Sequence, residues 1–300
     1  MLFYSANQYY KSIFGHKVYK ISINGGMSCP NRDGTLSTEG CIFCSGKGSG
    51  DFSTESTMDI NAQIECAIEK VRNKIKEDKF IAYFQSFTNT YAPVEYLEKI
   101  FTQAINHPKV IALSIGTRPD CLETEVLKLL DRLNQIKPVF VELGLQTIHT
   151  KTADYINRCY PLEIFDIAVK NLKAININVI VHVIIGLPGE TKEMIYSTVK
   201  YVGKSGADGI KLQLLHVLEH TKLAEDYKKG KFEVLTLEEY TNIICHCIEI
   251  IPKNMVIHRI TGDGPKKILI APKWSGNKKL VLNTINNELQ KRNIIQGSAL

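Results

Sequence analysis

The chain has 300 residues, of which 44% are apolar and 23% are charged, and its 37 Lys and Arg residues outnumber its 31 Asp and Glu residues. This composition is typical of a globular protein that buries a large core, and the formal charge of +6 would help to hold a polyanion without requiring one. No stretch approaches the roughly 18 apolar residues of a membrane helix, and the first residues lack the apolar core of a signal peptide, so we expect a cytoplasmic protein with no membrane partner.

Short apolar runs rich in β-branched residues recur along the chain, and each is typical of a buried strand. Between them, apolar side chains repeat at helical spacing, as at Ile60, Ile64 and Ile68. Strands that are apolar on both faces and alternate with helices predict a parallel sheet covered by helices, either open or rolled into a barrel. In such folds the chemistry lies where the strands end. The six predicted strands begin near residues 17, 80, 110, 139, 179 and 209.

Three of the eight cysteines, Cys29, Cys41 and Cys44, lie in one loop rich in Gly, Ser and Asn directly after the first predicted strand. Clustered thiols in a chain that is not secreted favour metal binding over disulfides, and the CxxC spacing lets two of them grip one centre. A zinc site would need a fourth ligand, with His16 or Cys66 as the nearby candidates. A cubane iron–sulfur cluster held by three cysteines instead leaves one iron open to a substrate or cofactor.

The amino-acid sequence around these cysteines, over almost the whole chain, resembles the bacterial YhcC/YtqA-type radical S-adenosylmethionine (SAM) family. The resemblance is carried by KVYKISINGGMSCPNRDGT, YFQSFTNTYAP, SIGTRPDCL, VELGLQTIH, IIGLPGET, LLHVLEHTKLA and HRITGDGPK. That family shares the long separation between Cys29 and Cys41, and its core is similar to the radical SAM domain of elongator-type tRNA-modifying proteins. The resemblance implies a [4Fe–4S] cluster on Cys29, Cys41 and Cys44, with SAM bound at the open iron and cleaved to a 5′-deoxyadenosyl radical.

The resemblance also implies which residues surround SAM. Phe43 occupies a usually aromatic position beside the adenine, and FTNTY stands where many relatives receive the methionine amino group. Gln146 matches a glutamine that touches SAM, and the guanidinium of Arg158 matches one that reaches its carboxylate. His182 stands near the ribose, with a satisfied interior histidine as the alternative. The expected SAM contacts are Phe43, Thr88, Asn89, Thr90, Gln146, Arg158, His182, Gly186, Gln213 and Leu215.

Three residues at other strand ends are expected on the substrate side. Arg118 and Asp120 match the elongator-type pattern, and a local ion pair after a strand is the alternative interpretation. Gly116 stands where related enzymes carry a glutamate, so the ribose contact of that carboxylate is not carried over. His216 follows the sixth predicted strand and is a candidate proton carrier or substrate contact.

The remaining cysteines are expected to be structural. Cys245, His246 and Cys247 resemble a metal triplet, but they lie in an apolar helical stretch where alternate residues diverge, which predicts core packing. Small apolar filler is the expected role of the three cysteines without a partner at ligand spacing, Cys66, Cys121 and Cys159.

Together these observations predict a partial (β/α)6 barrel. Residues 1–218 would form the radical SAM core, with a cluster-binding loop at 25–50, and residues 219–300 would form a C-terminal extension packed on the barrel. The expected substrate is a tRNA, with remodelling of the C5 substituent of a wobble uridine, and the expected electron donor is a protein such as flavodoxin or ferredoxin. Radical chemistry on a small metabolite or a peptide is one alternative, and a non-catalytic, zinc-bearing RNA-binding module is another.

Overall fold

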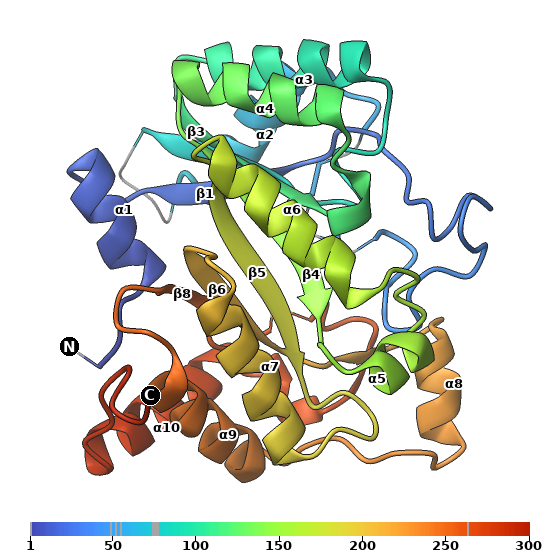
Figure 1. Ribbon diagram of the computed structural model, residues 1–300, viewed down its shortest axis with the longest axis vertical. Helices are drawn as coiled ribbons and strands as arrows, with labels where there is room; N and C mark the ends of the chain where they lie inside the picture. Colours follow the sequence, from blue (N-terminus) through green and yellow to red (C-terminus); the bar gives the residue numbers. More distant parts are fainter. Residues whose placement is uncertain (1, 49, 52, 55, 74–77, 263) are drawn as a thin grey trace.

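Seven parallel strands form one curved sheet, an open half-barrel, in the computed structural model, which describes residues 2–48, 50–51, 53–54, 56–73, 78–262 and 264–300 (Figure 1). The first six strands are neighbours in chain order, as successive strand–helix–strand units produce. In sheet order the strands are β1 (Tyr19–Ile23), β2 (Phe80–Phe84), β3 (Val110–Thr117), β4 (Val139–Gln146), β5 (Asn178–Ile185), β6 (Gly209–Leu214) and β8 (Val256–Arg259).

Helices cover the outer face of the sheet and share one large hydrophobic core with it (Figure 1). Val141 and Leu143 of β4, for example, lie in this core with Leu129 and Phe165 of the covering helices. Burial on this face explains why the strands carry no polar face toward solvent. The helices between the strands are α2 (Ile60–Val71), α3 (Val94–Asn106), α4 (Thr124–Ile136), α5 (Thr150–Tyr155), α6 (Leu162–Ala174) and α7 (Lys192–Lys204).

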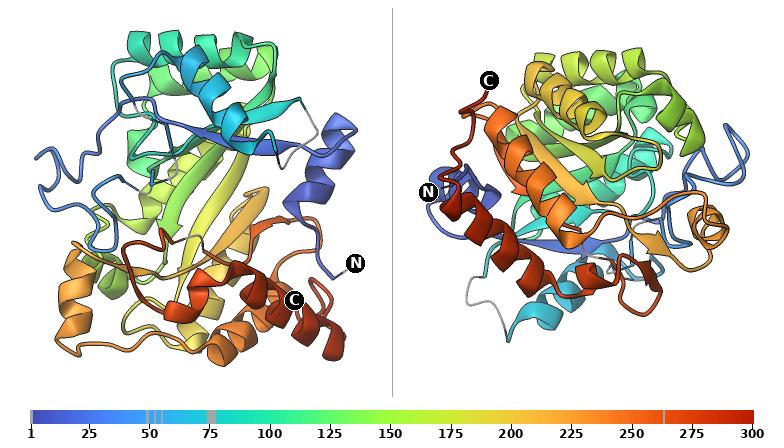
Figure 2. Two further views of the ribbon diagram at one scale, coloured as in Figure 1. Left: turned by 180° about the vertical axis from the view of Figure 1, so that it is seen from behind. Right: turned by 90° about the horizontal axis from the view of Figure 1, so that it is seen from below.

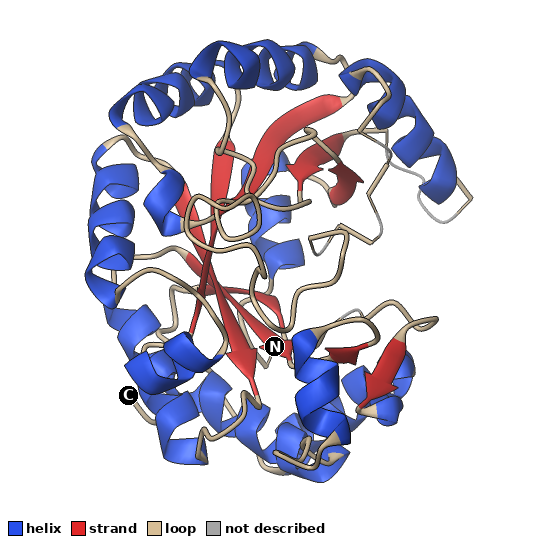
Figure 3. Ribbon diagram, turned by 90° about the vertical axis from the view of Figure 1, so that its right-hand side faces the viewer, coloured by secondary structure: helices blue, strands red, loops and turns tan. Residues whose placement is uncertain are grey.

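The inner face of the half-barrel begins with an apolar layer at the amino ends of the strands. Ile81, Phe140 and Ile180 belong to one buried cluster there, and Tyr10 places its ring centroid 5.7 Å from that of Phe140. Tyr10 lies on α1 (Ala6–Phe14), so this helix closes the end of the barrel where the strands start. Figure 3 looks onto the opposite end, where the strands stop and long connecting loops gather.

The C-terminal part of the chain contributes to the same sheet. β8 pairs with β6 in parallel, with Val256 opposite Gly209, and two short strands form a separate antiparallel pair. Figure 2 shows the last two long helices side by side at the sheet edge. The boundary predicted between residues 218 and 219 stays a prediction. The remaining elements are β7 (Val217–Leu218), α8 (Lys222–Lys228), α9 (Leu237–Ile250), β9 (Leu269–Ala271) and α10 (Lys278–Lys291).

The partial barrel predicted from the sequence is confirmed. Each of the six predicted strands begins within two residues of its expected position, and the pattern at Ile60, Ile64 and Ile68 is the buried face of α2. The seventh strand, β8, was not among the six because its four residues are too short to give an alternation signal. Within the described ranges, no helix combines the length and apolar character that crossing a membrane requires.

Candidate active site

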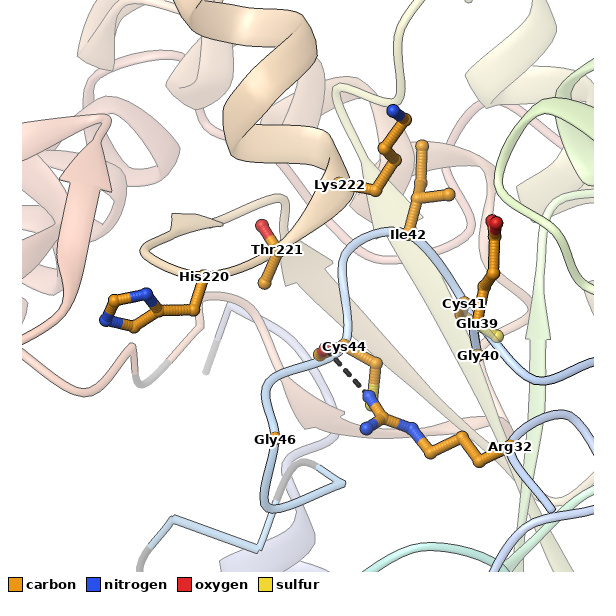
Figure 4. Close-up of a pocket in the computed structure, with 10 residues that line it drawn as sticks. All are labelled: Arg32, Glu39, Gly40, Cys41, Ile42, Cys44, Gly46, His220, Thr221 and Lys222. Atoms are coloured by element: carbon orange, nitrogen blue, oxygen red, sulfur yellow. Dashed lines mark hydrogen bonds between the residues drawn. The ribbon is translucent and has the colours of Figure 1, made fainter.

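The loop after β1 carries the three predicted cluster cysteines and is held by its own side chains. The buried Asn31 amide donates to the Cys41 sulfur over 3.5 Å and to the Asn157 carbonyl over 2.5 Å. The Arg32 guanidinium donates to the Cys44 carbonyl over 2.9 Å (Figure 4). The Cys44 amide in turn donates to the Cys41 carbonyl over 2.9 Å. These bonds fix Cys41 and Cys44 in one tight turn.

Cys29, Cys41 and Cys44 lie close enough for their charges to interact. Burial raises the pKa of Cys41 to about 12, with a further rise from Cys44 and Cys29 that Arg118 opposes. Because thiols bind metals as thiolates, a bound metal would displace this proton. Among the described residues, no three His, Cys, Asp or Glu side chains are arranged to hold a single metal ion. The three thiols therefore lie within electrostatic reach of one another at the carboxyl end of the barrel, without being arranged as ligands of a single ion.

A pocket of about 110 Å³ opens beside two of these cysteines (Figure 4). One wall is the cysteine loop, and the other is the turn before α8, where Thr221 accepts a hydrogen bond from the Ala224 amide over 3.1 Å. The pocket therefore lies between the cysteine loop and the C-terminal part of the chain. Its lining residues are Arg32, Glu39, Gly40, Cys41, Ile42, Cys44, Gly46, His220, Thr221 and Lys222.

Buried acceptors without a donor mark the strand ends near the cysteines. In the part of the chain that the structure describes, Asn31 Oδ1, Asn89 Oδ1 and Gln146 Oε1 have no hydrogen-bond partner. The Asn89 amide donates to the Gly116 carbonyl over 2.8 Å, which fixes its orientation, and Gln146 has a φ of 69° at the end of β4. Burying a polar atom without a partner is costly, so a ligand that brings N–H or O–H donors suits this place.

Thr88 and Thr90, the other two predicted SAM contacts in the FTNTY motif, hold the chain in place. The Thr88 amide donates to the Ser28 carbonyl over 3.2 Å, which ties the motif to the cysteine loop. The Thr90 hydroxyl donates to the Cys121 carbonyl over 2.5 Å. Of the three predicted SAM contacts in this motif, Asn89 is therefore the one with a buried acceptor that has no donor in the described chain.

An apolar wall borders the same loop. Phe43 packs against a buried cluster that includes Ile184 and Leu215. Gly186, just after β5, has a φ of 89°, and a Cβ there would lie 3.0 Å from a methyl of Leu235. The turn therefore needs glycine for both its conformation and its packing. Three of the predicted SAM contacts, Phe43, Gly186 and Leu215, thus lie on or beside this wall.

Arg118 and Asp120 form a bidentate ion pair just after β3. Arg118 Nε lies 2.9 Å from Asp120 Oδ1, and Nη2 lies 2.7 Å from Oδ2. Burial opposes the charge of Arg118, but the bonds to Asp120 raise its pKa, and so do the thiols of Cys41 and Cys29. The local ion pair exists, and it also lies within electrostatic reach of the predicted cluster cysteines.

Arg158 holds the segment after β4 in place through hydrogen bonds to backbone carbonyls. Its guanidinium is buried and donates to the carbonyls of Leu145, Thr147 and Tyr160 over 2.5 to 3.1 Å. Its Cζ also lies 4.4 Å from the centroid of the Tyr160 ring. A contact with the SAM carboxylate would compete with these three acceptors, and that contact stays a prediction.

His216, after β6, is positioned by two glycines. A Cβ on Gly262 would lie 2.2 Å from His216 Cε1, and one on Gly264 would lie 3.0 Å from Cδ2. Any larger residue at Gly262 would collide with the ring, so Gly262 and Gly264 leave the space that it occupies. Its role toward the substrate stays a prediction.

The comparisons with known proteins agree with this geometry. Residues 32–202 match the radical SAM superfamily, and residues 207–291 match the radical SAM C-terminal domain. The chain is 44% identical to the uncharacterized protein YtqA of Bacillus subtilis (strain 168) over 295 residues, which are 98% of this chain and 92% of YtqA. It is 35% identical to protein YhcC of Escherichia coli (strain K12), over 96% of this chain and 92% of YhcC. The chain belongs to the YhcC/YtqA family of radical SAM enzymes.

Two other similarities of this radical SAM enzyme are partial. It is 31% identical over 166 residues to the tRNA uridine(34) acetyltransferase of Methanocaldococcus jannaschii, which are 54% of this chain and 30% of that protein. Its fold matches that of archaeal Methanocaldococcus infernus Elp3 lacking its N-terminus, with a TM-score of 0.69 at 20% identity, over 93% of this chain and 64% of that one. The second similarity shows a shared half-barrel fold.

Radical SAM proteins in general bind SAM and a [4Fe–4S] cluster, and the chemistry of the residues here suits both groups. Thiols are the usual ligands of such clusters, and three of them are neighbours on one loop. The amino group and ribose hydroxyls of SAM are donors, and Asn89 and Gln146 offer buried acceptors that have no donor among the described residues. The apolar wall at Phe43 suits a purine ring.

His182 and Gln213 lie deeper in the half-barrel, in a charged network that sequence analysis missed. His182 Nε2 lies 2.6 Å from Glu142 Oε2, and Nδ1 lies 3.2 Å from Gln213 Nε2. Burial and the nearby Lys211 lower the pKa of His182 to about 4, so the imidazole is neutral at pH 7. The sequence contains a signal for this network, because Glu142 interrupts the apolar strand VFVELGLQ. A buried carboxylate requires cationic or hydrogen-bonding partners.

The remaining cysteines divide into two kinds. Cys245 and Cys247 are buried in the core on α9, as predicted, while the ring of His246 lies 4.3 Å from that of Tyr196. The prediction that Cys159 is buried filler is wrong, because this residue is exposed. Cys159 has a φ of 61°, and this left-handed backbone conformation directs its side chain away from the core.

Proposed function

We propose that this radical SAM enzyme cleaves SAM reductively at a [4Fe–4S] cluster bound by Cys29, Cys41 and Cys44. When bound, the cluster and SAM would supply a one-electron cleavage that yields the 5′-deoxyadenosyl radical. The observation that carries the proposal is that three thiols of one loop lie within electrostatic reach of one another, while Asn89 and Gln146 at nearby strand ends keep buried acceptors without a donor in the described chain. The electron would come from a small redox protein such as flavodoxin or ferredoxin.

The residues around the thiols have separate tasks in this proposal. Asn31 donates to the Cys41 sulfur and so favours its thiolate form. Asn89 and Gln146 accept hydrogen bonds from the amino and hydroxyl groups of SAM and orient it. Phe43 and its apolar neighbours hold the adenine and exclude water from the reactive radical.

We further propose that the substrate is a tRNA and that the reaction remodels the C5 substituent of its wobble uridine. The similarity to a protein named tRNA uridine(34) acetyltransferase supports this substrate, and the formal charge of +6 favours a polyanionic partner. His216, Arg118 and Asp120 stand at the strand ends on the expected substrate side. His216 would contact the base or carry a proton, and the Arg118–Asp120 pair would orient it.

Nucleoside analysis of bulk tRNA tests the substrate. Cells that lack the gene are compared with cells that carry the wild-type gene, Cys44→Ser or Cys66→Ser, and digested tRNA is separated by liquid chromatography and mass spectrometry. We expect a precursor of one wobble uridine to accumulate without the gene and with Cys44→Ser, whereas Cys66→Ser restores the wild-type profile. An unchanged profile without the gene would reject tRNA as the substrate.

A further inference from the structure

Inside the half-barrel, six strands each contribute one inward side chain to a polar layer above the apolar floor. We call it the charged layer; below it, Ile81, Phe140, Ile180 and Tyr10 form the apolar floor. Alternation along each strand places these residues on the inner face, because their sequence neighbours lie in the outer core. The charged layer consists of Lys20, Tyr83, Ser114, Glu142, His182 and Lys211.

Glu142 is the saturated centre of the charged layer. Its Oε1 accepts from Lys20 and from Ser114, the latter over 2.7 Å, and its Oε2 accepts from Lys211 and from His182, the latter over 2.6 Å. A carboxylate offers about four acceptor positions, so this one is filled. The Glu142 side chain is 0% exposed and has no contact left to offer a ligand.

Lys211 is far from saturated. Within the described chain, this ammonium group donates to Glu142 alone, although it carries three N–H bonds and its side chain is 6% exposed. Its Nζ also lies 4.9 Å from the centroid of the Tyr83 ring, which attracts cations but accepts no strong hydrogen bond. Lys20 donates to both Glu142 and Ser114 and lies 5.0 Å from the same ring. A buried ammonium with unused donors is an incomplete site.

The charges in the layer do not cancel. Lys20 and Lys211 face one carboxylate, Glu142, and His182 is neutral at pH 7. Burial lowers the pKa of Lys211 to about 7, with Glu142 opposing the effect and Lys20 adding to it. Positive charge is thus in excess when both lysines are protonated, and Arg259 adds to it. The groups that face Lys211 are Lys20 of β1, Tyr83 of β2, Glu142 of β4, His182 of β5, and His258 and Arg259 of β8, and Tyr10 of α1 faces the neighbouring Lys20.

The layer is open toward the strand ends and closed below. The side chains of Lys20 and His182 are 18% and 16% exposed, whereas Glu142 beneath them is sealed. Above the layer, β3 and β4 place Gly116 and Gly144 on the inner face, so neither strand contributes a side chain there. A group that enters from the cysteine end therefore meets cations before it meets the carboxylate.

We propose that Lys211 and Lys20 form a subsite for a carboxylate of the substrate, which donates no proton and accepts from both ammonium groups. The charge is complementary, because the layer has an excess of positive charge and a carboxylate is a small anion whose two oxygens can each accept from one ammonium group. The inference rests on the proposed function and deepens it: the end of the substrate that enters the barrel is acidic. Ser114 and Tyr83 position the two lysines, and neither binds the ligand.

The ionisation of Lys211 reports on this subsite directly. The reconstituted enzyme, carrying SAM and lysine labelled with ¹³C at the ε-carbon, is titrated by NMR with acetate, with the neutral isostere acetamide and with inorganic phosphate. Lys211→Met assigns the resonance, and Glu142→Gln/Lys211→Met, which removes both charges of this ion pair, does so if the single variant unfolds. The matched control is Lys128→Met, which removes an exposed lysine paired with Glu125.

We expect acetate to raise the midpoint of the Lys211 titration by about one pH unit, a tenfold gain in proton affinity, with acetamide inert and phosphate weaker. Lys20→Met should reduce the shift, and Lys128→Met should leave it intact. No shift with acetate, an equal shift with acetamide or phosphate, or a shift produced by SAM alone that acetate does not increase would each overturn the subsite. A shift with acetate together with an unchanged tRNA profile would uphold the subsite and reject tRNA.

Discussion

Replacing Glu142 by Gln removes the counter-charge of two buried lysines and is expected to destabilise the fold strongly. Removing one partner of a buried ion pair costs about 3 to 5 kcal/mol. Glutamine keeps one acceptor oxygen of the two that now serve Lys20, Ser114, His182 and Lys211. Because the pKa of Lys211 is already about 7, this lysine can release its proton, so we expect a loss near the lower limit, about 3 kcal/mol.

Urea unfolding of the wild-type and variant proteins measures this loss as a fall in the midpoint at unchanged slope. Adding Lys211→Met to Glu142→Gln should recover more than half of it, since the second change removes one of the stranded charges. Glu125→Gln, at an exposed ion pair with Lys128, is the control and should cost less than about 1 kcal/mol. A Glu142→Gln protein as stable as the control would refute the view that the charged layer holds the barrel together.

Three further outcomes are expected. Asn31→Ala loses the bonds to the Cys41 sulfur and to a backbone carbonyl, so it should unfold about 1 to 3 kcal/mol more easily and retain less iron after gel filtration. Between pH 7 and pH 8, the free energy of unfolding should rise by about 1 kcal/mol more in the wild type than in Lys211→Met. The reason is that the pKa of Lys211 is lowered in the folded protein, so the unfolded chain binds this proton more tightly than the folded chain does. The same pH dependence in both proteins would contradict this. Arg118→Lys keeps the charge but loses the bidentate bond to Asp120, so it should cost about 1 kcal/mol in the same urea assay and raise the KM for tRNA more than it lowers kcat.

The fold could be read from the sequence because its signal is local. Each central strand is a run of apolar residues buried on the outer face, and each helix shows one apolar stripe, so both patterns are visible within a dozen residues. β8 was not predicted from the sequence, because it has only four residues and its place in the sheet is set by its pairing with β6. That pairing joins distant parts of the chain, which no short sequence window records.

The candidate site was predictable in part for the same reason. The cysteines and FTNTY are contiguous motifs, but the contact from Asn31 to Asn157 joins residues 126 positions apart. The charged layer joins Lys20 to Glu142 across 122 positions, and only the barrel topology brings them together. Glu142 could be recognised from the sequence as a charged residue within an apolar strand. Lys20 could not, because nothing near it in the sequence distinguishes this lysine from a surface lysine.

Anaerobic reconstitution followed by electron paramagnetic resonance tests the central claim most directly. Protein supplied with iron and sulfide should bind about four irons per chain, and the spectrum of the reduced protein should change when SAM is added. Alanine at Cys29, Cys41 or Cys44 should abolish both results, whereas Cys66→Ala should preserve them. A colourless protein that holds one zinc per chain, or a spectrum that SAM leaves unchanged, would contradict an open iron held by these three thiols.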